Sequence, residues 1–269
     1  MVQRLSLGGS AAWLKRYDPD GWLRPALVGL WNGLARRIGI DALRSPPRRI
    51  GERAKEVEAR RLEALRASGA PVPRILGEGP RSLILSDMGP TLAHRLKRLP
   101  SANDADLLVR QTAQAIGELH RHGGYLGQAF ARNITVGDQG VGFIDFEEDP
   151  SEIMTLAQAQ ARDWVMFTTG MGTYYTGRMD VLSTLIREEA RGIEPQVAKE
   201  VHRIAGRLGF LERAGHLLGR RMASVGAAVG ALRKSFASLA VAALVVDVLS
   251  DGDCDVLIAV VDVVRNVAT

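Results

Sequence analysis

Residues 127–136 read Gly127-Gln128-Ala129-Phe130-Ala131-Arg132-Asn133-Ile134-Thr135-Val136, and a short turn leads from them to Ile144-Asp145-Phe146-Glu147. The pattern predicts a loop, then a two-stranded hairpin flanked by an amide side chain and a carboxylate. Strands of about five residues run out and back, so a hairpin of this size brings its two ends together. Asn133 and Asp145 would then offer oxygen ligands to one hard cation, and Mg²⁺ prefers a site with few protein oxygens. The stretch therefore predicts a magnesium site formed by these two residues.

The segments before this stretch read mostly as strands. Residues 1–17 alternate weakly between apolar and polar side chains, and two further short strands are expected near 74–77 and 82–86. A charged helix over residues 50–68 separates them and ends at a Ser-Gly pair. The residues expected on its buried face are Ile50, Val57, Leu62 and Leu65.

Helices dominate the rest of the chain. A long helix is expected from about Asp104 to His120, and residues 155–168 and several later segments also read as helical. Strands followed by helices predict an α+β fold with two lobes. The small, mostly antiparallel β lobe would span residues 1–88, and the large, mainly helical lobe residues 89–269. The tight connection Asp87-Met88-Gly89-Pro90 marks the boundary.

In this order the segments resemble the protein-kinase superfamily, whose catalytic loop carries an Asp five residues before an Asn. The chain looks most like the bacterial small-kinase branch, which includes lipopolysaccharide core (heptose and Kdo) kinases, RIO-type kinases and aminoglycoside phosphotransferases. Pro71-Val72-Pro73-Arg74-Ile75-Leu76 resembles the proline-flanked start of a strand in the sugar and antibiotic kinases. The resemblance covers roughly residues 5–170. It implies a protein-kinase-like fold with ATP and Mg²⁺ as cofactors.

The resemblance also implies roles for individual residues. Asn133 and Asp145 would hold the metal, and Phe146 would match the aromatic residue after the metal-binding Asp. Lys15, in Trp13-Leu14-Lys15, would reach the α- and β-phosphates and pair with Glu58 on the charged helix. An ion pair matters there because it holds a long, flexible ammonium group in one place.

Other positions follow from the same resemblance. Gly8-Gly9 would form a reduced glycine-rich phosphate loop, and Asp87 at the lobe boundary would contact the nucleotide. Asp163, in Ala161-Arg162-Asp163-Trp164, resembles the buried Asp that orients the catalytic-loop backbone. From the residues alone, an Arg-Asp pair on a helix surface remains the alternative for Asp163, and Glu56 competes with Glu58.

The pattern departs from the superfamily at Gln128, five residues before Asn133. Kinases place there the Asp that accepts the proton of the substrate hydroxyl, whereas a glutamine amide can only orient a hydroxyl by hydrogen bonding. General-base help is typically worth about 10²–10⁴-fold, so its loss would slow such an enzyme and need not abolish its activity. The candidate replacements are Glu147, which stands in place of the usual Gly, Glu148 and Asp149, with His120 and His122 as weaker candidates.

The net charge of +5 is concentrated between Lys15 and Arg61, where twelve Lys and Arg accompany six Asp and Glu. This range contains an insert, residues 18–49, that is longer than a strand-to-helix connection needs. Its apolar residues at helical spacing over 22–39 predict a helix packed on the small lobe. The alternative is an interfacial helix on an anionic membrane surface or on lipopolysaccharide precursors. No nucleic acid partner is expected, because the insert contains no recognised reading motif.

The remaining features of the sequence indicate the cellular compartment of the protein. The single cysteine, Cys254, excludes an internal disulfide and a Cys-rich zinc site, which fits a reducing compartment. The first residues carry no apolar segment of the kind found in secretory signals. The apolar residues 236–246 are too few to cross a bilayer core of about 30 Å and predict a buried helical hairpin. We therefore expect a cytoplasmic protein, with a peripheral position at the inner face of the membrane as the alternative.

These features predict an ATP- and Mg²⁺-dependent phosphotransferase of the atypical kinase class. The acceptor would be a bacterial envelope sugar, as for a lipopolysaccharide kinase, or a protein serine or threonine. Gln128 keeps a second hypothesis open, a pseudokinase that binds nucleotide as a regulatory module without turnover. The third is a basic peripheral membrane protein that uses the kinase fold as a scaffold. The acceptor itself is not named by the sequence, because acceptor sites in this superfamily are built from variable helices.

Overall fold

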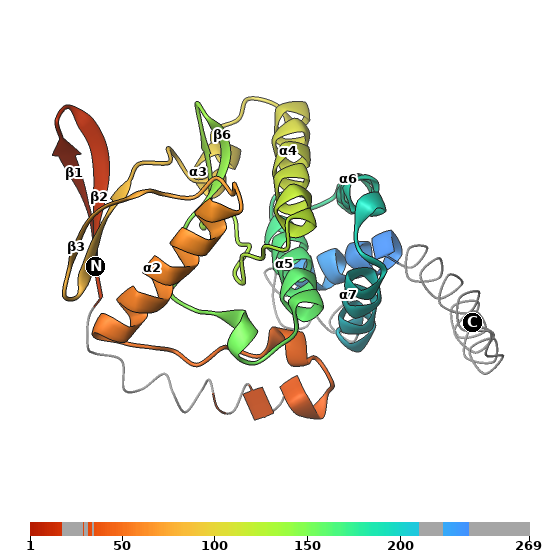
Figure 1. The fold of residues 1–269 in the computed structure, drawn as a ribbon. Coiled ribbons are helices and arrows are strands. Elements are labelled where there is room, and N and C mark those ends of the chain that lie inside the picture. Colours follow the sequence, from red (N-terminus) through yellow and green to blue (C-terminus); the bar gives the residue numbers. More distant parts are fainter. Residues whose placement is uncertain (18–28, 30–31, 34, 210–222, 237–269) are drawn as a thin grey trace, which may run out of the picture.

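The computed structural model describes residues 1–17, 29, 32–33, 35–209 and 223–236. Figure 1 shows a β-sheet at one end and a group of helices at the other, with α2 (Gly51–Ala67) and a second β-hairpin between them. The sheet is small and antiparallel, and most of the remaining regular structure is helical. The predicted α+β class is therefore confirmed.

The sheet has the strand order β1-β2-β4-β3, and all of its neighbouring strands are antiparallel. Its strands are β1 (Val2–Leu7), β2 (Ser10–Arg16), β3 (Ile75–Gly79) and β4 (Ser82–Ser86). Residues 1–17 thus form a hairpin of two strands, and the strands expected near 74–77 and 82–86 are confirmed. Lys15 lies on the interior strand β2, opposite Val2 on one side and Leu83 on the other. Because β2 pairs with a strand on each side, the backbone at Lys15 is fixed, and so is the Cα from which its side chain extends.

Helix α2 packs against β4 with one face buried. Val57, Leu62 and Leu65 lie on that face, as predicted. The prediction for Ile50 is wrong, because Ile50 is 52% exposed. It precedes the first helical turn with an extended backbone, so it does not share the buried stripe of the helix.

The second sheet is the predicted hairpin, formed by β5 (Ile134–Gly137) and β6 (Gly140–Phe143). Beyond its last pair, the Ile144 N–H donates to the Asn133 carbonyl at 2.9 Å, so the ladder continues one step to the residue before Asp145. The 87–90 connection passes against this hairpin. Gly89 has a φ of +85°, and a Cβ there would lie 2.8 Å from the Cα of Gly137, so this approach requires glycine.

The helical part contains α3 (Leu92–Leu96), α4 (Ala102–Arg121), α5 (Leu156–Met171), α6 (Met179–Glu189) and α7 (Pro195–Arg207), and residues 223–236 are also helical. The helices predicted over 104–120 and 155–168 are confirmed as α4 and α5. Thr155 and Gln158 form a capping box at the start of α5, which sets where this helix begins. Helix α5 packs against α7, and α4 packs against α6.

The described part of the insert packs on the helical part, whereas the sequence favoured the small lobe. The short turn η1 (Asp41–Leu43) contacts α5, and Arg162 Nη1 donates to the carbonyls of Ala42 and Arg44 at 3.0 and 2.8 Å. Most of the predicted 22–39 helix lies outside the described residues, so its membrane contact stays a prediction.

The C-terminal hairpin prediction also lies outside the described residues, except for Phe236. That side chain is fully buried, and its ring lies 6.2 Å from the ring of Trp164. Among the residues that the structure describes, every helix is too short or too polar to cross a bilayer.

Candidate active site

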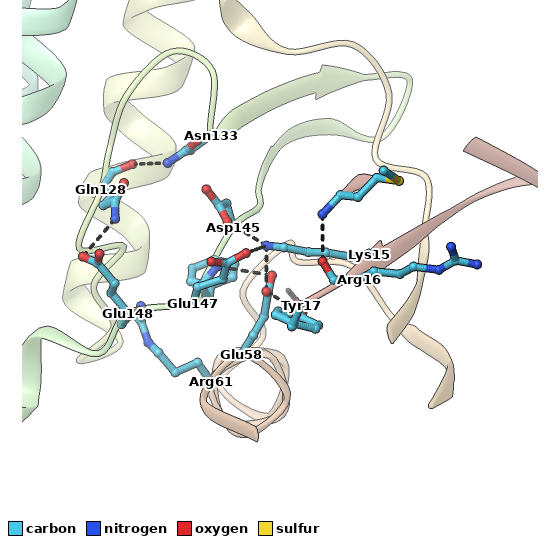
Figure 2. Close-up of polar contacts among 12 residues, drawn as sticks. Lys15, Arg16, Tyr17, Glu58, Arg61, Gln128, Asn133, Asp145, Glu147 and Glu148 are labelled. Atoms are coloured by element: carbon cyan, nitrogen blue, oxygen red, sulfur yellow. Dashed lines mark hydrogen bonds and ion pairs between the residues drawn. The ribbon is translucent and has the colours of Figure 1, made fainter. Parts of the chain in front are cut away.

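Lys15 lies at the centre of a cluster of carboxylates (Figure 2). Its Nζ is 2.7 Å from Glu58 Oε2, 2.7 Å from Asp145 Oδ1 and 3.0 Å from Glu147 Oε1. Burial alone would lower the pKa of Lys15, but Glu58, Asp145 and Glu147 outweigh it and raise the pKa above its usual value. Lys15 is therefore a charged ammonium group at neutral pH, and three separate chain segments meet at it.

Glu58 is held on both of its oxygens. The Tyr17 hydroxyl donates to Oε2 at 2.6 Å, and the Phe146 N–H donates to Oε1 at 3.3 Å. Glu58 is 1% exposed, whereas Glu56 is exposed. Of the two glutamates, Glu58 is therefore the one that pairs with Lys15. Tyr17 was missed by the sequence reasoning, although its position two residues after Lys15 would have placed it on the same side of an extended chain.

Asp145 reaches Lys15 from a strained backbone. Its φ is +73°, a value that among the described non-glycine residues occurs at Asp145 alone. Such conformations cost about 1–3 kcal/mol and persist only where the surroundings enforce them. Phe146 follows with a buried ring, and its N–H bond to Glu58 ties the segment to α2. The strain thus falls on the residue that joins the hairpin to the Lys15 cluster.

Asn133 and Asp145 line one cleft with Lys15. Asn133 Nδ2 donates to the Gln128 carbonyl at 3.1 Å, which leaves the amide Oδ1 as an acceptor. An amide oxygen and a carboxylate oxygen fit the ligand set that Mg²⁺ uses in proteins. The carboxylate oxygens of Glu58, Asp145 and Glu147 also lie within 4.8 Å of one another. In this arrangement the ammonium of Lys15 is the counter-ion of all three carboxylates, Asp145 included.

The cleft has a volume of about 460 Å³, in the range of small-molecule sites. Beside the charged groups it has apolar walls, formed by Val2, Pro73, Leu85, Met88 and Ile144. Asp87 lines it as well, and its Oδ1 accepts from Trp13 Nε1 at 3.0 Å and from the Gly89 N–H at 2.9 Å. Gly8 and Gly9 form the β1–β2 turn and are not among the described residues that line the cleft.

Asp163 is fully buried and holds the backbone of the loop before Gln128. It accepts from the N–H groups of Leu126 and Gly127 at 2.6 and 2.7 Å. Arg162 is buried too, and its Nε donates to the Gly127 carbonyl at 2.6 Å, so the pair does not lie on a helix surface. His120 Nε2 lies 3.1 Å from Asp163 Oδ2, which places this histidine beneath the loop and away from the cleft.

Arg61 is a site residue that the sequence reasoning missed. It is buried on α2, and its guanidinium donates to the carbonyls of Tyr125, Leu126 and Glu148 at 2.8, 3.1 and 2.8 Å. Residues three positions apart share one helix face, so its spacing from Glu58 was the available signal. Arg61 thereby fastens α2 to the loop at 125–126 and to the segment after Asp145.

The three acidic residues after Phe146, which the sequence offered as proton acceptors, have different partners. Gln128 Nε2 donates to Glu148 Oε2 at 3.0 Å, while Glu147 contacts Lys15. Asp149 accepts from the Tyr125 hydroxyl at 2.7 Å and pairs with Arg60 at 3.0 Å. His122 is exposed just after α4, and its ring contacts Glu118 instead of these acidic residues.

Comparison with known proteins adds no family assignment. No protein-family model matches the chain, and no curated protein is similar to it at a significant level. The functional interpretation therefore rests on the geometry of the cleft and on the residues that line it.

Proposed function

We propose that this chain is an ATP- and Mg²⁺-dependent phosphotransferase with a protein-kinase-like, two-lobed fold. The observation that carries the proposal is the bonding of one buried ammonium, Lys15, to Glu58 on α2 and to Asp145 after β6. These residues are far apart in sequence, and they meet in a cleft that Asn133 also lines. Such a grouping supports a site for a polyphosphate with its cation.

Different residues of the cleft would bind the phosphates, the Mg²⁺ ion and the base of the nucleotide. The Lys15 ammonium would contact the phosphates, and Glu58 would hold that ammonium in place with Tyr17 behind it. Asn133 and Asp145 would hold Mg²⁺, which neutralises phosphate charge when bound. The apolar wall of Val2, Leu85 and Met88 suits the base of a nucleotide. Asp163 would keep the Gln128 loop in register through its two backbone hydrogen bonds.

The acceptor is a hydroxyl in either of the two forms expected from the sequence, an envelope sugar such as a lipopolysaccharide precursor or a protein Ser or Thr. Both have the same reacting atom, so the cleft chemistry is common to them. A panel with one sugar arm and one protein arm separates them by which product carries the γ-phosphate.

The second candidate function is a pseudokinase, a nucleotide-binding module without turnover. Gln128 favours it, because an amide at this place cannot accept a proton at neutral pH. Binding and turnover distinguish the two functions, since both require the Lys15 cluster and only the first releases ADP.

The test is MgATP affinity by titration calorimetry and ADP release by a coupled assay, with Asp145→Asn and Asp138→Asn as a matched pair. Asp138 is exposed in the β5–β6 turn and serves as the control. We expect Asp145→Asn to lower MgATP affinity by at least about tenfold, the lower end for changes around a metal site. Asp138→Asn should leave affinity within about twofold. A chain that binds no MgATP would contradict the proposal, and binding with no ADP release above the Asp145→Asn background would favour the pseudokinase.

A further inference from the structure

Three consecutive acidic residues follow Phe146, and their contacts differ in kind. Glu147 is committed to Lys15, with its Oε1 3.0 Å from the ammonium. Asp149 is nearly buried and is committed to Tyr125, Ser151 and Arg60. Glu148 has neither arrangement, because among the described residues the one donor to its side chain is the Gln128 amide, at 3.0 Å. The charges of Arg162 and Arg48 also act on Glu148, but among the described residues neither arginine forms an ion pair with it. A proton acceptor must have a carboxylate that is not held in an ion pair, and Glu148 meets this requirement best of the three.

We propose that Glu148 accepts the proton of the acceptor hydroxyl and that Gln128 positions the Glu148 carboxylate for this step. The inference rests on the proposed phosphotransferase function and deepens it. The O–H bond of the acceptor breaks and its proton passes to Glu148. The oxygen forms a bond to the γ-phosphorus, and the bond from that phosphorus to the β–γ bridging oxygen breaks, so ADP leaves with the electron pair.

The backbone on both sides of this pair is fixed. Arg61 Nη1 donates to the Glu148 carbonyl at 2.8 Å, and Arg162 Nε donates to the carbonyl of Gly127 at 2.6 Å. Asn133 Nδ2 adds a bond to the Gln128 carbonyl at 3.1 Å. Two buried arginines from different helices therefore set the distance between residues 128 and 148. A carboxylate on so rigid a support can be held ready for an incoming hydroxyl.

The position of the pair agrees with this role. In the view of Figure 2, Asp145 lies between the Lys15 ammonium and Gln128, and Glu147 lies between the ammonium and Glu148. Gln128 and Glu148 are not among the described residues that line the cleft, and Gln128 borders it through its bond to Asn133. In the proposed function, a phosphate held at Lys15 and Asp145 would have the pair beyond Asp145 and Glu147, and an acceptor hydroxyl that approaches from that side would meet Glu148. Partial burial raises the pKa of Glu148, although Arg162 and the Gln128 hydrogen bond oppose the shift. An ionised carboxylate with a raised pKa is a stronger proton acceptor than an exposed one.

The experiment measures single-turnover ATP hydrolysis at saturating MgATP, with water as the acceptor, so no acceptor needs to be identified. We expect Glu148→Gln to reduce the rate by about 10²–10⁴-fold, the usual contribution of a general base. MgATP affinity should stay within about twofold, which also shows that the variant is folded. Glu118→Gln is the matched control, because Glu118 is 55% exposed on α4 and should retain the wild-type rate.

A rescue variant separates catalysis from support of the loop. In Gln128→Asp/Glu148→Gln the carboxylate and the amide exchange places, and we expect the rate to recover by at least about tenfold over Glu148→Gln, a small part of a general base's contribution. A loss in Glu148→Gln without recovery in the double variant would show a structural role and overturn the inference. So would a Glu148→Gln rate equal to that of the wild type.

The wild-type protein itself distinguishes the two levels of the proposal. If it binds MgATP but hydrolyses no more than Asp145→Asn does, the Glu148 inference is overturned and nucleotide binding stands. If it binds no MgATP, the proposed function fails and the inference fails with it.

Discussion

On the Lys15 side of the cleft, one ammonium is joined to Glu58, Asp145 and Glu147, and Glu58 has two further donors. On the Gln128 side, which borders the cleft without lining it, a neutral amide shares one hydrogen bond with one half-buried carboxylate, Glu148. The Lys15 group is charged and is held by several contacts, whereas the Gln128–Glu148 pair is joined by a single hydrogen bond. Changes on the Lys15 side should therefore affect binding and stability together, and changes on the Gln128 side should affect turnover alone.

The largest expected effect is that of Lys15→Met. Removing the ammonium leaves Glu58 as a buried carboxylate without its counter-charge, and breaking a buried ion pair costs about 3–5 kcal/mol of unfolding free energy. Urea denaturation measures this loss, and calorimetry should show that MgATP binding is lost with it. Lys55→Met is the matched control, because its partner Glu78 is 47% exposed and the change should cost at most about 1 kcal/mol. If Lys15→Met and Lys55→Met lost the same free energy of unfolding, the Lys15 cluster would not have the special stabilising role proposed for it.

A smaller effect is expected for Gln128→Leu, which keeps the size of the side chain and removes its hydrogen bond to Glu148. One hydrogen bond to a charged group contributes about 1.5–3 kcal/mol, so turnover should fall by about ten- to a hundredfold. MgATP affinity should change by less than about twofold, because the Lys15 cluster is untouched. Stopped-flow measurement of ADP release, beside calorimetry, checks the prediction. A loss of affinity as large as the loss of rate would show that the two sides are not separate.

The smallest expected effect concerns Asp149, next to Glu148 in the chain but held differently. Burial alone would raise the pKa of Asp149, but hydrogen bonds from Tyr125 and Ser151 and the charge of Arg61 outweigh it and lower the pKa. A carboxyl group with a lowered pKa stabilises the fold fully above its unfolded pKa of about 3.9 and loses this contribution as the pH falls. The stability difference between wild type and Asp149→Asn should thus be largest near pH 7 and shrink toward pH 3. A difference that is constant over this range, measured by urea denaturation, would contradict the assignment.

The elements of this fold were largely predictable, because strand and helix signals are local in the chain. The β5–β6 hairpin, the strands β3 and β4 and the helices α4 and α5 all lie where their patterns placed them. Ile50 shows the limit of such a pattern: its apolar side chain matches the helical stripe, but it lies before the helix begins. Hydrophobicity alone does not locate the first turn.

The candidate site was predictable in part. Lys15, Glu58 and Asp145 were expected together because their order along the chain resembles that of the protein kinases, and the structure brings Lys15 within hydrogen-bond distance of the other two. Arg61 and Tyr17 were missed, although their spacing from Glu58 and Lys15 puts them on the same face, because spacing indicates a side and does not identify a partner. Their roles depend on which carbonyl or carboxylate a distant segment presents.

Residue types and their spacing were enough to predict the strands β3 and β4, the β5–β6 hairpin, the helices α2, α4 and α5 and the set of charged side chains available for chemistry, because these follow from neighbours along the chain. The partner of each charged group was decided by packing. Glu147, Glu148 and Asp149 are chemically similar neighbours, yet one meets an ammonium, one an amide, and one a hydroxyl and a guanidinium. That difference arises because a turning backbone points successive side chains in different directions, toward segments that only the folded chain brings near.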